Sequence, residues 1–202
     1  MIALVDYGAG NLASVRKALR ACGADVFEPA GPADLDCASA IVLPGVGHFA
    51  ATASLDERWR AAIRQRLEGG IPFLGICLGM QWLFEGSDEA TAVPGLGWLP
   101  GRITRLPDRA PGGGRLKVPH AGWNAVRATG PSGVPGLKDG AYFYFTHAYA
   151  APVTDATAAT TVYGVPFASA VRRGHVRGVQ FHPEKSGAEG LALLGAFVGG
   201  GR

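Results

Sequence analysis

Residues 71–81 of the chain read Ile71-Pro72-Phe73-Leu74-Gly75-Ile76-Cys77-Leu78-Gly79-Met80-Gln81 and join an apolar run to a helical pattern without an intervening loop. A continuous apolar run of this length is typical of a strand that is buried on both faces. We therefore expect a strand over Ile71–Ile76 and a helix over Leu78–Phe84, with Cys77 at their junction.

The segment before this junction repeats the alternation of strand and helix. We expect strands at Ile2–Val5, Val26–Phe27 and Ala40–Leu43, and amphipathic helices at Leu12–Cys22, capped by Asn11, and at Arg58–Leu67. Alternating helices and apolar strands favour a parallel sheet that is covered by helices on both faces.

The pattern changes after Val93, where Pro/Gly-rich turns separate segments without a helical period. These segments predict antiparallel strands or hairpins around Gly97–Leu106, Lys117–Arg127 and Ala141–Tyr149, a mobile surface loop at Arg105–Arg115, strands at Val165–Arg172 and Val176–Phe181, and a closing helix at Gly190–Val198. We expect one α/β domain over residues 1–202. Its fold class is a three-layer flavodoxin-like sandwich, with a mainly parallel central sheet and antiparallel hairpins in the second half.

The composition disfavours several classes of protein. The 202 residues carry a net charge of +3 and have a mean hydropathy of +0.14. No apolar stretch approaches the ~18 residues of a membrane helix, and no block of like charges points to a nucleic-acid partner. Cys22, Cys37 and Cys77 lack paired spacing, and no metal-ligand spacing occurs, so we expect no disulfide framework and no metal site. The N-terminus lacks a signal-peptide pattern, which predicts a cytoplasmic protein.

Gly75-Ile76-Cys77-Leu78-Gly79 fits the Gly-x-nucleophile-x-Gly pattern of a nucleophile elbow. In such a turn the nucleophile adopts a strained conformation, and small neighbours prevent clashes on either side. A thiol at the start of a helix also faces backbone amides that favour the thiolate. The alternative is a buried core cysteine. The flanking glycines at a strand–helix junction favour the nucleophile.

A cysteine nucleophile requires a base that is itself held by an acceptor. His182-Pro183-Glu184 follows the apolar strand Val176–Phe181, at the strand end where α/β sheets place their sites. The two-residue offset lets Glu184 orient the imidazole. Cys77, His182 and Glu184 are therefore a candidate triad for acyl transfer.

A glycine-rich turn, Pro44–Gly47, follows the predicted strand Ala40–Leu43. Backbone N–H groups of Gly45, Val46 and Gly47, together with the amide of Leu78, would stabilise the oxyanion of a tetrahedral intermediate. By itself this motif also fits an ordinary tight turn.

Together these motifs resemble those of class I (triad) glutamine amidotransferases. Three further segments are similar to the glutaminase subunits of imidazole glycerol phosphate synthases. They are Pro119-His120-Ala121-Gly122-Trp123-Asn124, Tyr144-Phe145-Thr146-His147-Ala148-Tyr149 and Gln180-Phe181-His182-Pro183-Glu184-Lys185-Ser186. The resemblance extends from Asp6-Tyr7-Gly8-Ala9-Gly10-Asn11 to the closing helix, over essentially the whole chain.

The resemblance implies a reaction on glutamine that needs no cofactor. Cys77 would attack the side-chain amide and release ammonia, His182 would protonate the ammonia and later activate water, and Glu184 would orient His182. Gln81 and Glu89 match positions that hold the α-amino end of glutamine, and His147, Ala148 and Tyr149 match the segment near its carboxylate. Ala148 replaces the hydroxyl residue usual in the family, so a side-chain hydrogen bond from this position is missing.

The resemblance also implies a partner. The family docks onto a (β/α)₈-barrel cyclase subunit as a heterodimer, and ammonia passes through the barrel to a second active site. That site forms imidazole glycerol phosphate and aminoimidazole carboxamide ribotide in histidine biosynthesis. Asn11, Trp123 and Lys185 match positions at or near the interface, although Trp123 also fits a core aromatic residue and Lys185 a solvated side chain. The glycine-flanked amide of Val46 is expected to rotate before it faces the oxyanion, which predicts slow hydrolysis without the cyclase.

Other functions stay open at this point. Gly8-Ala9-Gly10-Asn11-Leu12-Ala13 fits a dinucleotide-binding fingerprint, with Glu28 at the distance of a ribose ligand, but that function leaves the elbow unexplained. The glutaminase of pyridoxal phosphate synthase would carry Gly-Gly-Glu-Ser in place of Pro44–Gly47. A triad peptidase and a catalytically inactive interaction subunit are the remaining alternatives, and the intact triad argues against the inactive subunit.

Overall fold

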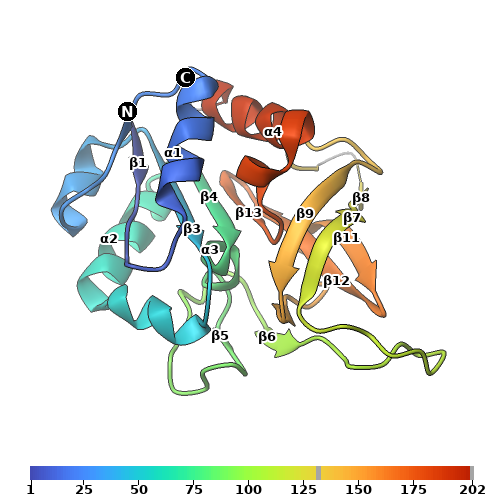
Figure 1. Ribbon diagram of the computed structural model, residues 1–202. Helices are drawn as coiled ribbons and strands as arrows, with labels where there is room; N and C mark the ends of the chain where they lie inside the picture. The colour runs from blue at the N-terminus through green and yellow to red at the C-terminus, as the bar shows by residue number, and fades with distance from the viewer. Residues whose placement is uncertain (131–132, 201–202) are drawn as a thin grey trace.

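The computed structural model describes residues 1–130 and 133–200 (Figure 1). Within these ranges the central sheet has eight strands. In spatial order they are β2 (Val26–Phe27), β1 (Ile2–Leu4), β3 (Ala40–Gly45), β4 (Phe73–Cys77), β13 (Val176–Val179), β12 (Val165–Arg173), β11 (Thr157–Tyr163) and β8 (Arg127–Ala128). The neighbours in the series β2, β1, β3, β4 and β13 pair in parallel, in the order of flavodoxin-like folds. Strands β13, β12, β11 and β8 pair antiparallel. The predicted α/β class, with parallel strands first and antiparallel strands in the second half, is confirmed, and both kinds of strand share one mixed sheet.

Helices cover both faces of the parallel strands (Figure 1). α1 (Leu12–Ala21) and α4 (Gly187–Gly199) pack on one face, and α2 (Glu57–Glu68) packs on the other. Along β1, Ile2 and Leu4 join the core cluster of α1 and α4, whereas Ala3 joins the cluster of α2. Because successive side chains enter opposite cores, every position of such a strand is apolar.

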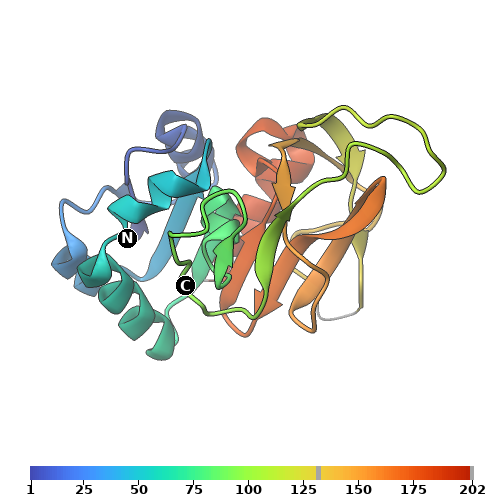
Figure 2. The same cartoon turned by 90° about the horizontal axis from the view of Figure 1, so that it is seen from below.

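Two smaller sheets are formed by the middle of the chain. β7 (His120–Ala125) pairs antiparallel with β9 (Tyr142–His147), and β10 (Tyr149–Ala150), β6 (Arg102–Arg105) and β5 (Gly86–Ser87) form the other sheet. Phe143 and Phe145 pack in the cluster of α1 and α4, and Ile103 packs in the cluster of α2. Seen from below, the antiparallel half lies beside the parallel half, and the β6–β7 loop extends away from both (Figure 2). This loop includes the predicted surface loop except Arg105, which ends β6.

Short helical turns complete the fold. They are η1 (Pro32–Cys37), η2 (Phe49–Ser54), α3 (Leu78–Gln81) and η3 (Pro183–Lys185), of which α3 and η3 contain or border the predicted triad residues. The structure confirms that α1 begins after Asn11, whose side chain accepts a hydrogen bond from the Ser14 amide at 3.4 Å. No helix in the described ranges is long and apolar enough to cross a membrane.

The helix after Cys77 is shorter than the sequence predicts, because α3 ends at Gln81 instead of Phe84. Backbone hydrogen bonds to the segment 95–99 draw the next residues into the core, where the side chains of Trp82, Leu83 and Phe84 are fully buried. Tertiary packing therefore overrides the local helical pattern after Gln81.

The sequence prediction also omitted β11, whose alanines and threonines carry little apolar signal.

Candidate active site

Cys77 ends β4 and immediately precedes α3, as the elbow pattern predicts. Its backbone adopts φ +53° and ψ −106°, and it is the one non-glycine residue with positive φ in the described part of the chain. Such a conformation costs about 1–3 kcal/mol for a residue with a side chain, and it persists where the surrounding structure enforces it. The strain singles out Cys77 as a candidate functional residue.

The two glycines of the elbow are required by packing. A Cβ atom at Gly79 would overlap the carbonyl oxygen of Leu43 on β3. A Cβ atom at Gly75 would lie 2.6 Å from the carbonyl oxygen of Gly79, closer than van der Waals contact allows. The elbow is therefore pressed against its own backbone and against β3, which holds the thiol in one position.

His182 and Glu184 meet the thiol from the end of β13. The Nδ1 atom of His182 lies 2.8 Å from Oε1 of Glu184, and both side chains are almost fully buried. Burial by itself lowers the pKa of His182, but hydrogen bonding and charge from Cys77 and Glu184 outweigh it and raise that pKa to about 9. Nε2 of His182 is buried and has no hydrogen-bond partner in the described residues, while Cys77 lies close enough to affect the pKa of the ring. The structure thus brings the three candidate triad residues together.

The glycine-rich turn after β3 lies beside the elbow, since Gly45 pairs with Cys77 across the sheet. In this conformation the Val46 amide donates to the carbonyl oxygen of Ala9 at 3.0 Å, and Gly47 has a φ of +101°. The Val46 N–H is therefore engaged by a backbone acceptor instead of being free to meet an oxyanion.

Tyr7 is a neighbour of this turn that the sequence analysis did not single out. A Cβ atom at Gly45 would overlap the Tyr7 hydroxyl oxygen, which is buried and has no hydrogen-bond partner among the described residues. Burial, together with the nearby Cys77 and Asp6, raises the pKa of the phenol. Tyr7 thus fixes the small size required at Gly45.

A cavity of about 40 Å³ opens at the thiol. Its lining includes residues of both predicted substrate-binding segments and one residue that the prediction omitted, Thr146. The full lining is Gly47, Cys77, Leu78, Gln81, Glu89, Thr146, His147, Ala148 and Tyr149. Glu89 accepts a hydrogen bond from the Phe49 amide at 2.7 Å, which fixes its carboxylate. The fold therefore gathers the predicted substrate residues around Cys77.

A buried polar network behind the thiol was also missed by the sequence analysis. Gln180, which is fully buried, donates from Nε2 to Sγ of Cys77 at 3.5 Å. His120 lies 3.2 Å from His147 and stacks on Phe145. A signal for Gln180 was present in the sequence, because a polar residue interrupts the apolar strand Val176–Phe181.

The predicted interface residues differ in their surroundings. Trp123 is 55% exposed, so the core alternative for this residue is wrong, and its ring meets that of Tyr144 at 6.2 Å. Lys185 Nζ lies 5.9 Å from the centre of the same Tyr144 ring. Asn11 uses its side-chain oxygen to cap α1. Trp123, Tyr144 and Lys185 therefore form one aromatic and cationic patch.

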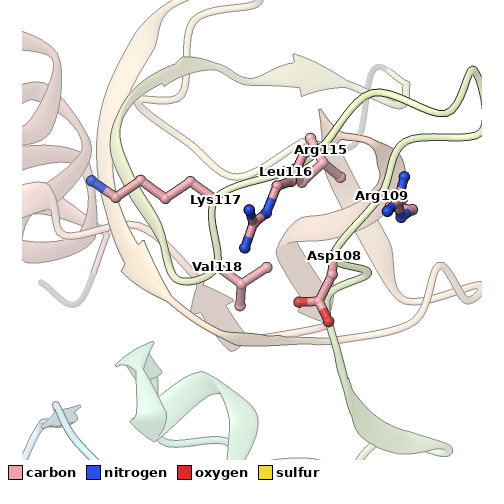
Figure 3. A pocket seen from close by; sticks show the side chains of 6 residues that line it. All are labelled: Asp108, Arg109, Arg115, Leu116, Lys117 and Val118. Carbon is pink, nitrogen blue, oxygen red and sulfur yellow. The ribbon is translucent and has the colours of Figure 1, made fainter.

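A larger cavity of about 810 Å³ is lined by Asp108, Arg109, Arg115, Leu116, Lys117 and Val118 of the β6–β7 loop (Figure 3). None of the predicted site residues lines it. Figure 3 shows the Lys117 amine and the Arg109 guanidinium at opposite sides of the view, so these cationic groups do not converge on one point. In the described residues no group of three or more His, Cys, Asp or Glu side chains is arranged to hold a metal ion.

Comparisons with known proteins identify the family. Residues 3–198 match the family model for class I glutamine amidotransferases. The chain is 47% identical to the imidazole glycerol phosphate synthase subunit HisH of Deinococcus radiodurans over 97% of this chain and 92% of that protein. It is 48% identical to HisH of Thermococcus kodakarensis over 98% of each protein.

Solved structures agree at the level of the fold. A crystal structure of a glutamine amidotransferase superimposes with a TM-score of 0.74 at 20% identity, covering 99% of this chain and 100% of that one. PurLQS from Thermotoga maritima gives a TM-score of 0.76 at 17% identity, covering 98% of this chain and 97% of that one. The chain therefore belongs to the class I glutamine amidotransferases and, within them, to the HisH family of imidazole glycerol phosphate synthase subunits.

Proposed function

We propose that this chain is the glutaminase subunit of an imidazole glycerol phosphate synthase and that Cys77, His182 and Glu184 are its catalytic triad. The observation that carries this proposal is the buried pair of His182 and Glu184, 2.8 Å apart, at the end of the strand that neighbours β4 and Cys77. With a pKa of about 9, the imidazole is protonated at neutral pH and lies between the Glu184 carboxylate and the Cys77 thiol. A thiolate beside an imidazolium supplies both the nucleophile and the acid that acyl transfer requires.

The reaction then follows in two steps. Sγ of Cys77 bonds to the side-chain amide carbon of glutamine, and the carbonyl oxygen becomes an oxyanion. His182 gives its Nε2 proton to the amide nitrogen, the C–N bond breaks, and ammonia leaves a glutamyl thioester. Neutral His182 next takes a proton from water, whose oxygen bonds to the thioester carbon. The C–S bond breaks, glutamate leaves, and Cys77 and His182 return to their starting state.

The substrate contacts are part of the same proposal. Gln81 and Glu89 hold the α-amino end of glutamine, and the segment His147–Tyr149 lies near its carboxylate. Their common location on the wall of the cavity beside Cys77 supports these roles. Since Ala148 has no hydroxyl group, this segment binds through its backbone.

Activity of the free chain is expected to be low. The oxyanion is stabilised by the amides of the Gly45–Gly47 turn and of Leu78, but the Val46 amide is occupied by Ala9. It must rotate before it can donate to the oxyanion, and the positive φ of Gly47 supplies the local freedom. We propose that docking of a (β/α)₈-barrel cyclase favours the rotated turn and receives the ammonia before water protonates it.

The patch of the exposed Trp123 and Lys185 with the half-buried Tyr144 supports the location of the cyclase interface, to which the family resemblance also assigns Asn11. Aromatic side chains of this kind are enriched among the residues that dominate binding energy. The variant Trp123→Ala should weaken cyclase binding about tenfold or more by calorimetry. Leu191→Ala, at an exposed position on α4, is the control and should leave the affinity unchanged. Equal affinities for both variants would place the interface elsewhere.

The decisive test is the variant Cys77→Ala in complex with the cyclase. Glutamine-dependent synthesis should be lost, whereas synthesis driven by an added ammonium salt should continue at the wild-type rate. Cys37→Ala, which removes an exposed thiol, should keep both activities. Loss of both activities in Cys77→Ala would show a structural role for the thiol. Full glutaminase activity of the wild-type chain without the cyclase would contradict gating of the Val46 turn.

Cytoplasmic residence is also proposed. It is supported by the cysteines, since Cys22, Cys37 and Cys77 are all unpaired. An assay of the chain in fractionated cells tests it, and recovery outside the cytoplasmic fraction would contradict it.

A further inference from the structure

A continuous chain of hydrogen bonds runs from the thiol to the surface strand β7. Gln180 Nε2 donates to Sγ of Cys77 at 3.5 Å, and Gln81 Nε2 donates to Gln180 Oε1 at 3.0 Å. The second N–H of Gln81 donates to the carbonyl oxygen of Tyr149 at 2.9 Å. The same carbonyl is 2.8 Å from Nδ1 of His147, so its two lone pairs are both used.

The outer part of the chain is a pair of buried histidines. Nε2 of His147 lies 3.2 Å from Nδ1 of His120, and Nε2 of His120 lies 3.3 Å from Nδ2 of Asn124. The Asn124 side chain is held by backbone groups, because Oδ1 accepts from the Ala125 amide at 2.8 Å and Nδ2 donates to the carbonyl of Val162 at 3.1 Å. Each end of the histidine pair is therefore anchored by the backbone.

These backbone anchors determine the direction of every bond between them. The Tyr149 carbonyl only accepts, so His147 carries its proton on Nδ1 and leaves Nε2 as an acceptor. His120 must then donate from Nδ1 and accept from Asn124 at Nε2. The orientation of Asn124, fixed independently by Ala125 and Val162, requires the same tautomer of His120. Both histidines are thus neutral in this network.

The electrostatics agree with that assignment. Burial lowers the pKa of His147 to about 3 and that of His120 to about 4, so both rings are neutral at physiological pH. His120 is also held between the rings of Phe145 and Tyr163, with centroid distances of 4.9 and 4.1 Å. A neutral, fixed pair of rings keeps the Tyr149 carbonyl in place.

The same logic fixes the amide next to the thiol. Because the Tyr149 carbonyl accepts from Gln81, the Gln81 atom beside it is nitrogen, and this nitrogen also donates to Gln180. The atom of Gln180 that receives this bond is its oxygen, so its nitrogen is left to face the sulfur. The amide cannot flip without placing two donors or two acceptors against each other, at a cost comparable to an unmade buried hydrogen bond.

We propose that Gln180 is a further residue of the catalytic site, which donates an N–H to the nucleophilic sulfur, and that Gln81 with the neutral His120–His147 pair positions this donor. This inference rests on the proposed role of Cys77 as the nucleophile. Gln180 and His182 both reach Cys77 from the segment that follows β13. A donor at this position stabilises the thiolate, whereas an acceptor would repel it.

Other titratable groups around the thiol belong in any interpretation of its pH dependence. His182 faces it from the segment after β13 and is paired with Glu184, and Tyr7 faces it from the segment after β1. Glu89 and His147 line the same cavity. The prediction is therefore a shift in the pH dependence of Cys77 reactivity, relative to wild type, when Gln180 alone is replaced and these other groups stay in place.

The test measures the rate at which iodoacetamide alkylates Cys77 in the full chain across the neutral and alkaline pH range. Mass spectrometry of the digested protein assigns the alkylation to each cysteine. Gln180→Glu replaces the donor with an acceptor of the same size. It should move the rate profile about one pH unit higher, and should slow alkylation by up to about tenfold at pH values where the wild-type thiol is only partly ionised. Alkylation of the exposed Cys37 in the same molecule should be unchanged.

Gln65→Glu is the matched control, because it makes the same chemical change at an exposed position on α2, and its Cys77 profile should equal that of wild type. If Gln180→Glu does not fold, Gln180→Met removes the donor without adding charge and should shift the profile in the same direction. In complex with the cyclase, either Gln180 variant should lower kcat more than it changes KM for glutamine.

A second readout uses the wild-type chain, labelled with ¹⁵N-histidine. Both His120 and His147 should appear as neutral rings protonated at Nδ1 near pH 7. An Nε2-protonated His147 would overturn the orientation argument, and an unshifted alkylation profile in the Gln180 variants would overturn the role of the donor. If either of these two results is found while the Cys77→Ala complex has lost glutamine-dependent synthesis, the further inference is refuted and the proposed function is not. A Cys77→Ala complex that still uses glutamine would instead refute the proposed function.

Discussion

Replacing Glu184 with glutamine removes the carboxylate beside His182 while keeping the size of the side chain. The two side chains form a buried pair at 2.8 Å. Burial lowers the pKa of His182, and Cys77 and Glu184 together raise it from 6.5 to about 9. A rise of this size corresponds to about 3 kcal/mol of interaction that favours the charged, folded form.

The direction of the pH effect follows from linkage. Because the folded-state pKa of His182 exceeds its unfolded value, this stabilisation is present in full below pH 6.5 and is lost as the pH rises to about 9. We expect this group to lower the free energy of unfolding of the wild-type chain by about 2–3 kcal/mol over that range. In Glu184→Gln only Cys77 still raises the His182 pKa against the lowering effect of burial. The decrease in the free energy of unfolding over this pH range should therefore shrink to about 1 kcal/mol or less.

Urea unfolding of the full chain, measured at several pH values between 6.5 and about 9, checks this expectation. The wild type and Glu184→Gln should differ most at the lower pH and converge toward the upper one. Glu28→Gln, which removes a carboxylate from an exposed ion pair with Arg16, is the control and should cost less than ~1 kcal/mol at every pH. Parallel curves for the wild type and Glu184→Gln would refute the charged His182–Glu184 pair.

Two further predictions concern packing and acid stability. Gly79→Ala should lower the free energy of unfolding by about 3 kcal/mol because its Cβ would overlap the Leu43 carbonyl, whereas Gly112→Ala, in open space, should change it by less than ~0.5 kcal/mol. Equal effects in thermal unfolding would contradict the tight elbow. His120 and His147 are neutral when folded but protonate when unfolded below pH 6.5, since burial lowers their pKa values to about 4 and about 3. The free energy of unfolding should therefore decrease as the pH is lowered from 6.5 to about 4, by about 1.4 kcal/mol per pH unit for each ring. In urea unfolding, His120→Phe should make this decrease less steep.

Much of the fold and of the candidate site could be predicted from local pattern. Apolar runs predicted the parallel strands because both faces of those strands are buried. The glycines around Cys77 predicted the elbow because a strained turn between a strand and a helix excludes side chains on either side. The spacing of His182 and Glu184 was informative because residues two apart beyond a strand end are close in any compact fold.

Other features depend on contacts between distant parts of the chain. The end of α3 at Gln81 follows from hydrogen bonds to the segment 95–99, and the exposure of Trp123 follows from the way β7 pairs with β9. A short sequence window contains neither partner of such contacts, so a helical or aromatic pattern is read there without its context.

The amino-acid sequence by itself therefore determined where the candidate nucleophile, base and carboxylate lie relative to the strand ends. The tertiary structure alone decided which way the polar groups around them point. The Val46 amide meets Ala9, and the Gln180 nitrogen meets the sulfur of Cys77, only because segments up to about a hundred residues apart are packed together. The physical reason is that a hydrogen bond has a direction, and residue order encodes the identity of its donor but not the acceptor that the fold brings to it.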